Sequence, residues 1–579
     1  MVMLLYSTSL LAFWLLLAAA SAAPASQSSP QVPPVVKIKN GTIQGYHNPH
    51  YDQDLFLGIP FASPPVANLR FKLPAPAKGW NGTRLADSYG PWCMGNSVGL
   101  VGFSQNSLAT ESEDCLHLNI VRPAGLPSNT SLPVLVWFHG GGFEEGSAAD
   151  QRYNGSFPVK TALGMGSPII FVSFNYRLGV WGSISGPPIE EAGLTNIFMH
   201  DQRQALAWVQ ENIAHFGGDP SKVTVMGESA GAISIGYQLL AYRGRDDGLF
   251  RAAIAESGGP LYMGAPLRNA SQRANDFELL LNTTGCSSAA HALGCLRQAP
   301  TASINQASNI VPFYPTVDGD FLPDHSMTLL RQNRFLKVPL LTGSNRNEGA
   351  TFTQLRMTRP FDTDDDFAQF VRACMQGWSI DNSTIQSWAR LYQEEVDTPS
   401  VAGLGTVSPN PGPSFGSGYG KATLWLGDMI FSTGRRLANQ KWAENNISTY
   451  GYFFDTVTNN VDASTSGAAH FQEIPYVFAN SQGVGWHLNP FPEDPILRKK
   501  HEKLATVMSR MWISFVVTGS PNFHRAEENI TWPVYSNSAP TLFGFSVEHG
   551  NYLQPDNWRV EAFQSLYQLA ASANSSVVY

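Results

Sequence analysis

The chain has 579 residues, of which 43% are hydrophobic and only 14% charged, against about 25% charged residues in a typical soluble domain. Its 37 Lys and Arg against 45 Asp and Glu give a net charge of −8, and no cationic run is dense enough to follow a phosphate backbone. These features predict a large globular core and argue against nucleic-acid binding, repeat architectures and long disordered linkers.

The N-terminus has the pattern of a secretory signal peptide, and we assign residues 1–22 to it. Residues 1–20 carry no charged side chain, and the apolar run from Leu10 ends in Ala20-Ser21-Ala22, a typical cleavage pattern. A membrane anchor is the alternative, but the apolar stretch is short for a bilayer span. The C-terminus lacks the hydrophobic tail of a lipid-anchor signal. We expect the folded domain to span residues 35–570.

Ten Asn-x-Ser/Thr sequons follow this segment and predict a secreted, N-glycosylated chain. They lie at Asn40, Asn81, Asn129, Asn154, Asn269, Asn282, Asn382, Asn446, Asn529 and Asn574. An oxidising compartment favours disulfides among the five cysteines. Spacing proposes Cys93 with Cys115 and Cys286 with Cys295, and leaves Cys374 unpaired. Metal ligation is the alternative, but neither pair has CxxC spacing or a histidine cluster nearby, so we expect no metal.

Apolar runs bounded by turn residues predict strands that are buried on both faces. They lie at residues 133–138, 168–174, 223–226, 252–255 and 338–341. Their hydrophobicity is continuous rather than alternating, as in a parallel sheet covered by helices. Between them, residues 201–216 place apolar side chains at helical spacing, and Gly217-Gly218-Asp219-Pro220 ends that helix. The order predicts an α/β fold with a large, mostly parallel sheet.

The sequence Gly227-Glu228-Ser229-Ala230-Gly231 matches G-x-S-x-G, the sharp strand-to-helix turn that presents a nucleophilic serine. It follows the predicted strand at 223–226 and precedes residues that favour a helix. A second match surrounds Ser414, in the Pro- and Gly-rich stretch 408–420 with no strand before it. We therefore interpret Ser229 as the candidate nucleophile and Ser414 as a surface-loop serine.

A glycine-rich loop, His139-Gly140-Gly141-Gly142-Phe143, directly follows the predicted strand at 133–138. Acyl transfer develops negative charge on a carbonyl oxygen, and glycines let backbone N–H groups approach that oxygen closely. A plain glycine-rich loop and a phosphate cradle are the alternatives, but no phosphate-binding frame begins here. His139 precedes Ser229 in the wrong chain order to act as its base, so we expect a structural role for it.

A serine nucleophile needs a general base, and the base needs an acid, in the chain order serine, acid, histidine. Glu348 is the candidate acid, because its loop leaves the carboxyl end of the predicted strand at 338–341. The histidines that follow are His470, His487, His501, His524 and His549. His470 is preferred, since it ends a small-residue loop placed after the strand-like residues 449–454.

With these motifs the chain resembles the type-B carboxylesterases, an α/β-hydrolase family that includes cholinesterases, lipases related to that of Candida rugosa and the non-catalytic neuroligins. The resemblance extends over nearly the whole mature chain. It rests on the motifs above and on residues 58–62, 69–71, 113–119, 175–177, 201–209, 216–220 and 347–349. Residues 196–200 depart from the family's glycine-bearing entry to the helix before the nucleophile.

The resemblance implies an α/β-hydrolase fold and an ester hydrolase that uses no metal or cofactor. It implies Ser229 as nucleophile, Glu348 as acid and His470 as base. The oxyanion hole would consist of Gly141, Gly142 and Ala230, and the disulfides would be Cys93–Cys115 and Cys286–Cys295. Ser257, in Glu256-Ser257-Gly258, is similar to a serine near the acid in this family, although a turn serine is an equal interpretation.

We therefore expect a secreted, fungal serine hydrolase of small-molecule carboxylic esters, with no nucleic-acid partner and no stable membrane anchor. Lipase or sterol esterase is a second enzymatic interpretation. A non-catalytic binding protein of the neuroligin kind is an interpretation of another class, but such members typically lose one of the three catalytic residues. The first disulfide loop, residues 94–114, is short and interrupted by glycines, which predicts no long lid and a preference for short or medium acyl chains.

Overall fold

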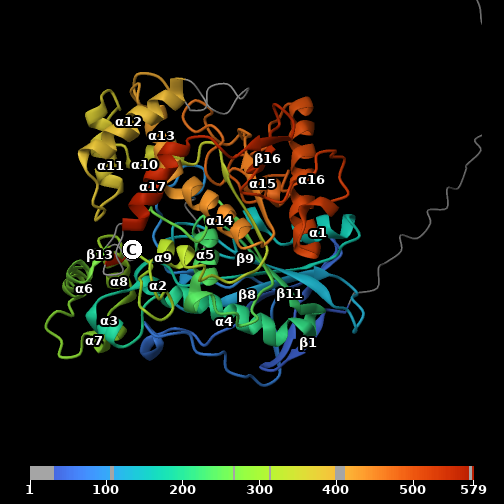
Figure 1. Ribbon diagram of the computed structural model, residues 1–579. Helices are drawn as coiled ribbons and strands as arrows, with labels where there is room; N and C mark the ends of the chain where they lie inside the picture. The colour runs from blue at the N-terminus through green and yellow to red at the C-terminus, as the bar shows by residue number, and fades with distance from the viewer. Residues whose placement is uncertain are drawn as a thin grey trace, which may run out of the picture.

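A mixed sheet of eleven strands forms the centre of the molecule (Figure 1). The computed structural model describes residues 32–104, 110–264, 268–311, 314–397 and 411–572, together with the backbone of 577–578. In sheet order the strands are β17 (Tyr552–Pro555), β16 (Thr541–Phe545), β15 (Thr449–Phe454), β14 (Leu340–Asn345), β12 (Ala252–Glu256), β11 (Gly218–Glu228), β9 (Leu132–Phe138), β10 (Ile170–Phe174), β8 (His117–Pro123), β4 (Gln53–Pro60) and β3 (Tyr46–Asn48). All pairs from β16 to β10 are parallel, and only the outer pairs are antiparallel.

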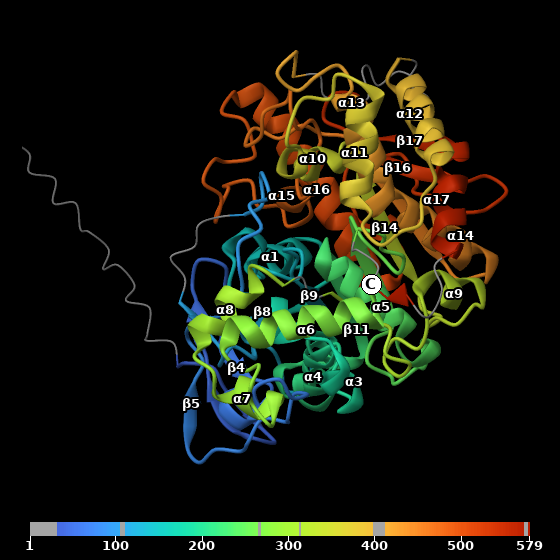
Figure 2. The same ribbon diagram turned by 90° about the vertical axis from the view of Figure 1, so that its left-hand side faces the viewer.

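Helices cover both faces of the sheet, so its strands are buried on both sides. In β9, Val134 and Val136 belong to the core under α4 (Ile197–Asn212), α5 (Ala230–Gly244) and α14 (Thr433–Glu444). The alternate residues of the same strand, Leu135 and Trp137, face α1 (Ser156–Gly164) and α16 (Pro495–Thr518). Two apolar faces explain why the strand sequences are continuous hydrophobic runs rather than alternating ones. Figures 1 and 2 show α1 and α16 grouped together on one side of the sheet.

A group of helices lies at one corner of the molecule, coloured yellow in Figures 1 and 2. It consists of α10 (Gly349–Arg356), α11 (Asp364–Cys374), α12 (Asn382–Asp397) and α13 (Tyr419–Gly427). The buried Trp388 and Trp425 pack between these helices, with their ring centroids 5.9 Å apart. From α13 the chain continues through the π-helix η4 (Asp428–Ser432) directly into α14. One long helical segment therefore runs from this corner back to the sheet.

The remaining strands and α-helices are not part of the central sheet. They are β1 (Val35–Ile38), β2 (Gly41–Gln44), β5 (Thr83–Leu85), β6 (Trp92–Cys93), β7 (Glu111–Ser112), β13 (Arg268–Asn269), β18 (Val577–Val578), α2 (Gly179–Ser183), α3 (Pro187–Glu191), α6 (Ala270–Thr284), α7 (Ala292–Gln298), α8 (Thr301–Ser308), α9 (Ser326–Arg331), α15 (Ile474–Val477) and α17 (Val560–Ser572). Among the described residues, none of the helices combines the length and the apolar character that crossing a bilayer requires.

The helix before the nucleophile differs from the prediction of residues 201–216 at both ends. It begins four residues earlier, at Ile197, because Asn196 adopts the left-handed conformation (φ 52°, ψ 35°) that a glycine takes freely. The Asn196 side chain is held by the backbone of Thr316, with hydrogen bonds of 2.7 and 2.8 Å. Its end is also different, since residues Ile213–Phe216 tighten into a 3₁₀ turn before Gly217. The conformation of Asn196 and its bonds to Thr316 thus set the start of this helix.

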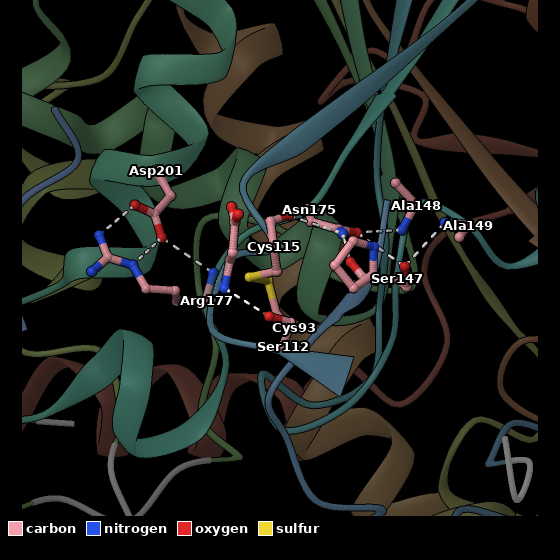
Figure 3. Close-up of a disulfide and its surroundings, with 11 residues drawn as sticks. Cys93, Ser112, Cys115, Ser147, Ala148, Ala149, Asn175, Arg177 and Asp201 are labelled. Carbon is pink, nitrogen blue, oxygen red and sulfur yellow. Dashed lines mark hydrogen bonds and ion pairs between the residues drawn. A yellow bond between two sulfur atoms is a disulfide. The ribbon is translucent and has the colours of Figure 1, made fainter. Parts of the chain in front are cut away.

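Two disulfides join the cysteines as spacing and resemblance predict, Cys93–Cys115 and Cys286–Cys295, and the Cys374 thiol is free and buried. Figure 3 shows the first bridge beside β10. There the Asn175 amide donates to the carbonyl oxygen of Cys115 at 3.1 Å and accepts from Ser147 at 3.0 Å. These bonds fix the base of the first disulfide loop against the sheet.

Candidate active site

Ser229 occupies a strained turn between β11 and α5. Its backbone has φ 54° and ψ −123°, a conformation that side-chain-bearing residues rarely adopt. The flanking glycines leave no room for a side chain, since a Cβ atom on Gly231 would lie 2.1 Å, and one on Gly227 2.8 Å, from the Phe138 carbonyl oxygen. The Ser229 N–H donates to the carbonyl oxygen of Glu256 at 2.9 Å. The surrounding strands therefore hold the turn that the G-x-S-x-G motif predicts.

The glycine loop after β9 lies directly beside this turn. A Cβ atom on Gly140 would be 2.9 Å from the Glu228 carbonyl oxygen and 3.1 Å from Cβ of Ser229, so glycine is favoured where the loop approaches this turn. Gly141 (φ 106°) and Gly142 (φ 64°) have backbone angles that favour glycine. Within the described part of the chain, the N–H groups of Gly141, Gly142 and Ala230 donate to no protein acceptor. These donors remain available to an anionic oxygen next to Ser229.

His139 packs against the glycine loop and holds its backbone in place. Its fully buried ring stacks on Tyr176 with centroids 4.3 Å apart, and its Nδ1 lies 2.9 Å from the Gly140 carbonyl oxygen. The Tyr176 hydroxyl in turn donates to the His139 carbonyl oxygen at 2.6 Å. Burial lowers the pKa of His139 to about 4, so the ring is neutral at neutral pH.

Glu348 and His470 meet although 122 residues separate them. Glu348 is the N-cap residue directly before α10, just past the end of β14, and His470 lies in the loop after β15. The His470 Nδ1 atom is 2.7 Å from Glu348 Oε2, and both side chains are 1% exposed. The other carboxylate oxygen of Glu348 accepts hydrogen bonds from the Ser257 hydroxyl and the Asn345 N–H, each at 2.6 Å. The carboxylate is therefore fixed by three groups and faces the imidazole.

Asn347 joins the two loops that carry Glu348 and His470. Its N–H donates to the Ala468 carbonyl oxygen at 2.9 Å, and its side-chain oxygen accepts from the Ala468 N–H at 3.0 Å. Gly467, at φ 60°, allows this approach, because a Cβ atom there would lie 2.4 Å from the Asn347 side-chain oxygen. The small-residue loop thus places His470 at a fixed position relative to the acid.

No hydrogen bond joins the Ser229 hydroxyl to His470 in this structure. The His470 Nε2 atom is 3.1 Å from Glu228 Oε1, but the two groups lack the alignment of a hydrogen bond. Among the described residues, the Ser229 hydroxyl makes no hydrogen bond, to His470 or to any other group. Catalytic hydrogen bonds often tighten only when a substrate is bound.

Three further glutamates are buried around this pair. Burial raises the pKa of Glu228 and of Glu256 well above the ordinary value. For Glu473, burial first and the charge of Glu348 second raise the pKa to about 8. Glu473 accepts from the Asn345 side chain at 2.5 Å and from Ser257 at 3.2 Å. Sequence analysis missed Asn345 and Glu473, because neither belongs to a local pattern and only the fold brings them to the acid.

The second G-x-S-x-G match has no such surroundings. Ser414 is exposed in the loop before α13, and no strand leads into it. The neighbouring Gly416 and Gly418 are nevertheless buried, because this loop pairs with Phe361 through two backbone hydrogen bonds. The surface-loop prediction therefore holds for Ser414 but not for these glycines; residues 408–410 lie outside the described chain. Across the described ranges, no group of three His, Cys, Asp or Glu side chains could hold a metal ion.

Comparisons with known proteins show the family to which this chain is similar. Residues 32–557 match the model of a family described as "Carboxylesterase family". Lipase 2 of Geotrichum candidum is 31% identical over 88% of this chain and 91% of the lipase. Lipase 4 of Diutina rugosa is 32% identical over 92% of this chain and 96% of the lipase. The crystal structure of Aspergillus niger EstA matches with a TM-score of 0.78 at 27% identity, over 93% of this chain and 98% of EstA.

Proposed function

The chain belongs to the carboxylesterase family and is an α/β-hydrolase that cleaves carboxylic esters, and from that premise we propose that it is a secreted serine esterase. It is therefore not the non-catalytic binding protein that the fold alone would also allow. In the proposal, Ser229 is the nucleophile, His470 the base and Glu348 the acid. The observation that supports these roles most is the buried contact of 2.7 Å between His470 and Glu348, next to a serine on a strained turn.

Acylation begins when His470 Nε2 takes the proton of the Ser229 hydroxyl. The Ser229 oxygen then forms a bond to the ester carbonyl carbon, and the carbonyl oxygen becomes negative. Glu348, held by Ser257 and the Asn345 N–H, keeps the Nδ1–H tautomer in place and stabilises the imidazolium. His470 returns the proton to the leaving alcohol as the ester bond breaks.

The oxyanion would be received by the N–H groups of Gly141, Gly142 and Ala230. Each such donor is worth on the order of 3 kcal/mol in transition-state stabilisation, because it needs no reorganisation when charge develops. Water then repeats the sequence on the acyl-enzyme, with His470 again as base, and releases the carboxylic acid. Every step uses groups of this chain and water.

Secretion and glycosylation are supported by two features. Seven sequon asparagines are exposed: Asn81, Asn129, Asn269, Asn282, Asn382, Asn446 and Asn529. The side-chain nitrogens of the half-buried Asn40 and Asn154 instead donate to Ala77 and Gln151 at 2.7 Å, so we expect these two to carry less glycan. The two disulfides suit an oxidising compartment. The proposed signal peptide and Asn574 lie outside the described residues.

We propose that short or medium acyl chains are preferred, and the lipase relatives make lipase activity the second candidate. In the first disulfide loop, Leu100 and Phe103 are buried in the core under α16, which leaves Val101 as an exposed apolar side chain. So small an apolar surface gains little at an oil interface. Residues 105–109 of this loop lie outside the described chain.

A series of nitrophenyl esters from acetate to palmitate, run with and without a fluorophosphonate, tests the proposal. We expect turnover to be highest for the shorter acyl chains. It should decrease in proportion to the fraction of Ser229 that is labelled and reach zero at complete labelling. Hydrolysis that survives complete labelling would contradict the serine mechanism. A maximum at palmitate would favour the lipase alternative while leaving the mechanism intact.

A further inference from the structure

The imidazole of His470 is packed between two phenylalanine rings that the sequence motifs do not include. Phe431 stacks on it face to face, with ring centroids 4.5 Å apart and planes 22° apart. Phe352, from α10, contacts it at 5.0 Å with the planes inclined by 59°. Phe431 is 2% exposed and His470 1%. Water is therefore excluded from the imidazole face that Phe431 covers.

Phe431 reaches this position because it lies in the π-helix η4 between α13 and α14. A π turn adds one residue to an α-helical turn and so rotates the side chains that follow by about 100°. Asp428, the first residue of η4, is buried and accepts hydrogen bonds from the Tyr392 hydroxyl at 3.0 Å and from Arg559 Nε at 2.7 Å. These bonds fix the bulge, and the bulge sets the direction of the Phe431 ring.

The same helical segment also contacts the acid. A Cβ atom on Gly427, one residue before η4, would lie 3.2 Å from Cβ of Glu348 and 2.8 Å from the Gly349 nitrogen. A Cβ atom on Gly349 would lie 2.0 Å from the carbonyl oxygen of Thr423 in α13. Only glycine at both positions allows so close an approach. One continuous segment, α13 with η4, therefore packs against Glu348 Cβ, the backbone of Gly349 and the ring of His470.

Resting on the proposed role of His470 as base, we propose that Phe431 is a positioning residue for the reaction. Its ring holds the imidazole in the plane that faces Glu348, and its negative π-face stabilises the imidazolium that forms when Ser229 gives up its proton. The π-helix is the device that presents this ring.

Loss of the Phe431 ring should have two measurable effects, one on kcat and one on the pH dependence of the rate. Loss of the ring destabilises the imidazolium in the transition state, so kcat should fall about tenfold. It also destabilises the imidazolium of the resting enzyme, so the ascending limb of the pH–rate profile should move to lower pH. KM should change little, because Phe431 acts through His470. A merely structural role would lower activity without moving the limb.

The test compares Phe431→Leu with Phe367→Leu. Phe367 is a fully buried phenylalanine of the same helical group that packs on Trp425 rather than His470, so its variant controls for lost core volume. We expect lower kcat and an acid-shifted limb for Phe431→Leu, and an unchanged limb and kcat for Phe367→Leu. If Phe431→Leu keeps the wild-type kcat and limb, or if Phe367→Leu moves the limb equally, the proposal is overturned.

Replacement of Phe431 by fluorinated phenylalanines provides a second arm in case the leucine variant does not fold. Fluorine withdraws electron density from the π-face with little change of shape, so the limb should shift progressively from one to five fluorines. No shift across the series would also overturn the proposal. Active-site titration of the wild type with fluorophosphonate separates a failure of the serine mechanism from a failure of the positioning role. An unlabelled Ser229 contradicts the serine mechanism. Normal labelling of Ser229, together with no effect of the Phe431 substitutions, contradicts only the positioning role.

Discussion

Glu348 and Glu473 share the hydroxyl of Ser257, whose oxygen lies 2.6 Å from Glu348 Oε1 and 3.2 Å from Glu473 Oε1. Two carboxyl groups this close in a buried site resist being charged together. Burial and the charge of Glu348 raise the pKa of Glu473 to about 8, so we expect Glu473 to carry the proton at neutral pH. At neutral pH the acid of the proposed triad is therefore supported by a neutral carboxyl group.

The Glu473 proton makes the stability of the fold depend on pH. Its folded pKa, about 8, lies above the ordinary value of 4.5, so the folded state keeps a proton that the unfolded state has lost. The free energy of unfolding should therefore fall between pH 4.5 and 8, with a contribution of at most about 1.4 kcal/mol per pH unit. Glu473→Gln should lose this contribution, which urea unfolding of both proteins at pH 5, 6.5 and 8 measures. Parallel pH dependences for the two proteins would contradict the assignment.

A fluorophosphonate should label Ser229 with one-to-one stoichiometry, and Ser229→Ala should abolish both labelling and esterase activity. Only a hydroxyl next to a base is nucleophilic enough near neutral pH. Ser414→Ala is the matched control from the second G-x-S-x-G match and should behave as wild type. Labelling that persists in Ser229→Ala, detected by peptide mass spectrometry, would remove Ser229 as nucleophile.

Glu348→Gln should lower kcat about a thousandfold while changing the free energy of unfolding far less. An amide cannot stabilise the imidazolium as a carboxylate does, yet it can still accept from Ser257 and Asn345. Activity of the wild type should rise with pH through one ionisation, since His470 must be neutral to take the proton. Glu493→Gln, at an exposed glutamate, serves as the control. Wild-type turnover in Glu348→Gln would place the acid elsewhere.

Loss of the first disulfide should destabilise the protein by about 3 kcal/mol, because Cys93 and Cys115 close a loop with a sequence separation of 22. The double variant Cys93→Ala, Cys115→Ala should show this in urea unfolding, whereas Cys374→Ala removes no cross-link. Mass spectrometry of the unreduced protein checks the pairing. A peptide that joins Cys374 to another cysteine would contradict it.

Hydrolysis of a partly soluble triglyceride should rise smoothly through its solubility limit. In the described part of the first disulfide loop, Leu100 and Phe103 are buried, so that part leaves little apolar surface free to bind an emulsion. The rate measured against total triglyceride concentration tests this. A sharp increase where the emulsion forms would reverse the expectation in favour of a lipase.

The sequence predicts the centre of this fold better than its edges. The strand-like residues 449–454 form β15 with the same bounds, and each apolar run overlaps a strand of the sheet, because central strands need apolar residues on both faces. The outer strands β16 and β17 were not predicted; β17 is short and only partly buried, whereas β16 is largely buried. The start of α4 depends on Asn196 and its bonds to Thr316, a partner 120 residues away that no local pattern indicates.

The site likewise has one part that the sequence could predict and one part that it could not. Ser229 and the glycine loop lie on motifs whose spacing is set by one strand and one turn, so their neighbourhood could be predicted from the sequence. The contacts of Glu473, Asn345 and Phe431 arise from tertiary packing alone. Phe431 depends in addition on a π turn, which helix periodicity does not reveal.

The order of the active-site elements along the chain has a consequence for biosynthesis. The glycine loop and Ser229 lie on β9 and β11, whereas the Glu348–His470 pair follows β14 and β15. At about 5–20 residues per second, a ribosome completes the nucleophile's turn some tens of seconds before His470 is made. During that interval the growing polypeptide contains the proposed nucleophile without its proposed base. On these proposed roles, ester cleavage can begin only after the segment that follows β15 has been made and has brought His470 to the site.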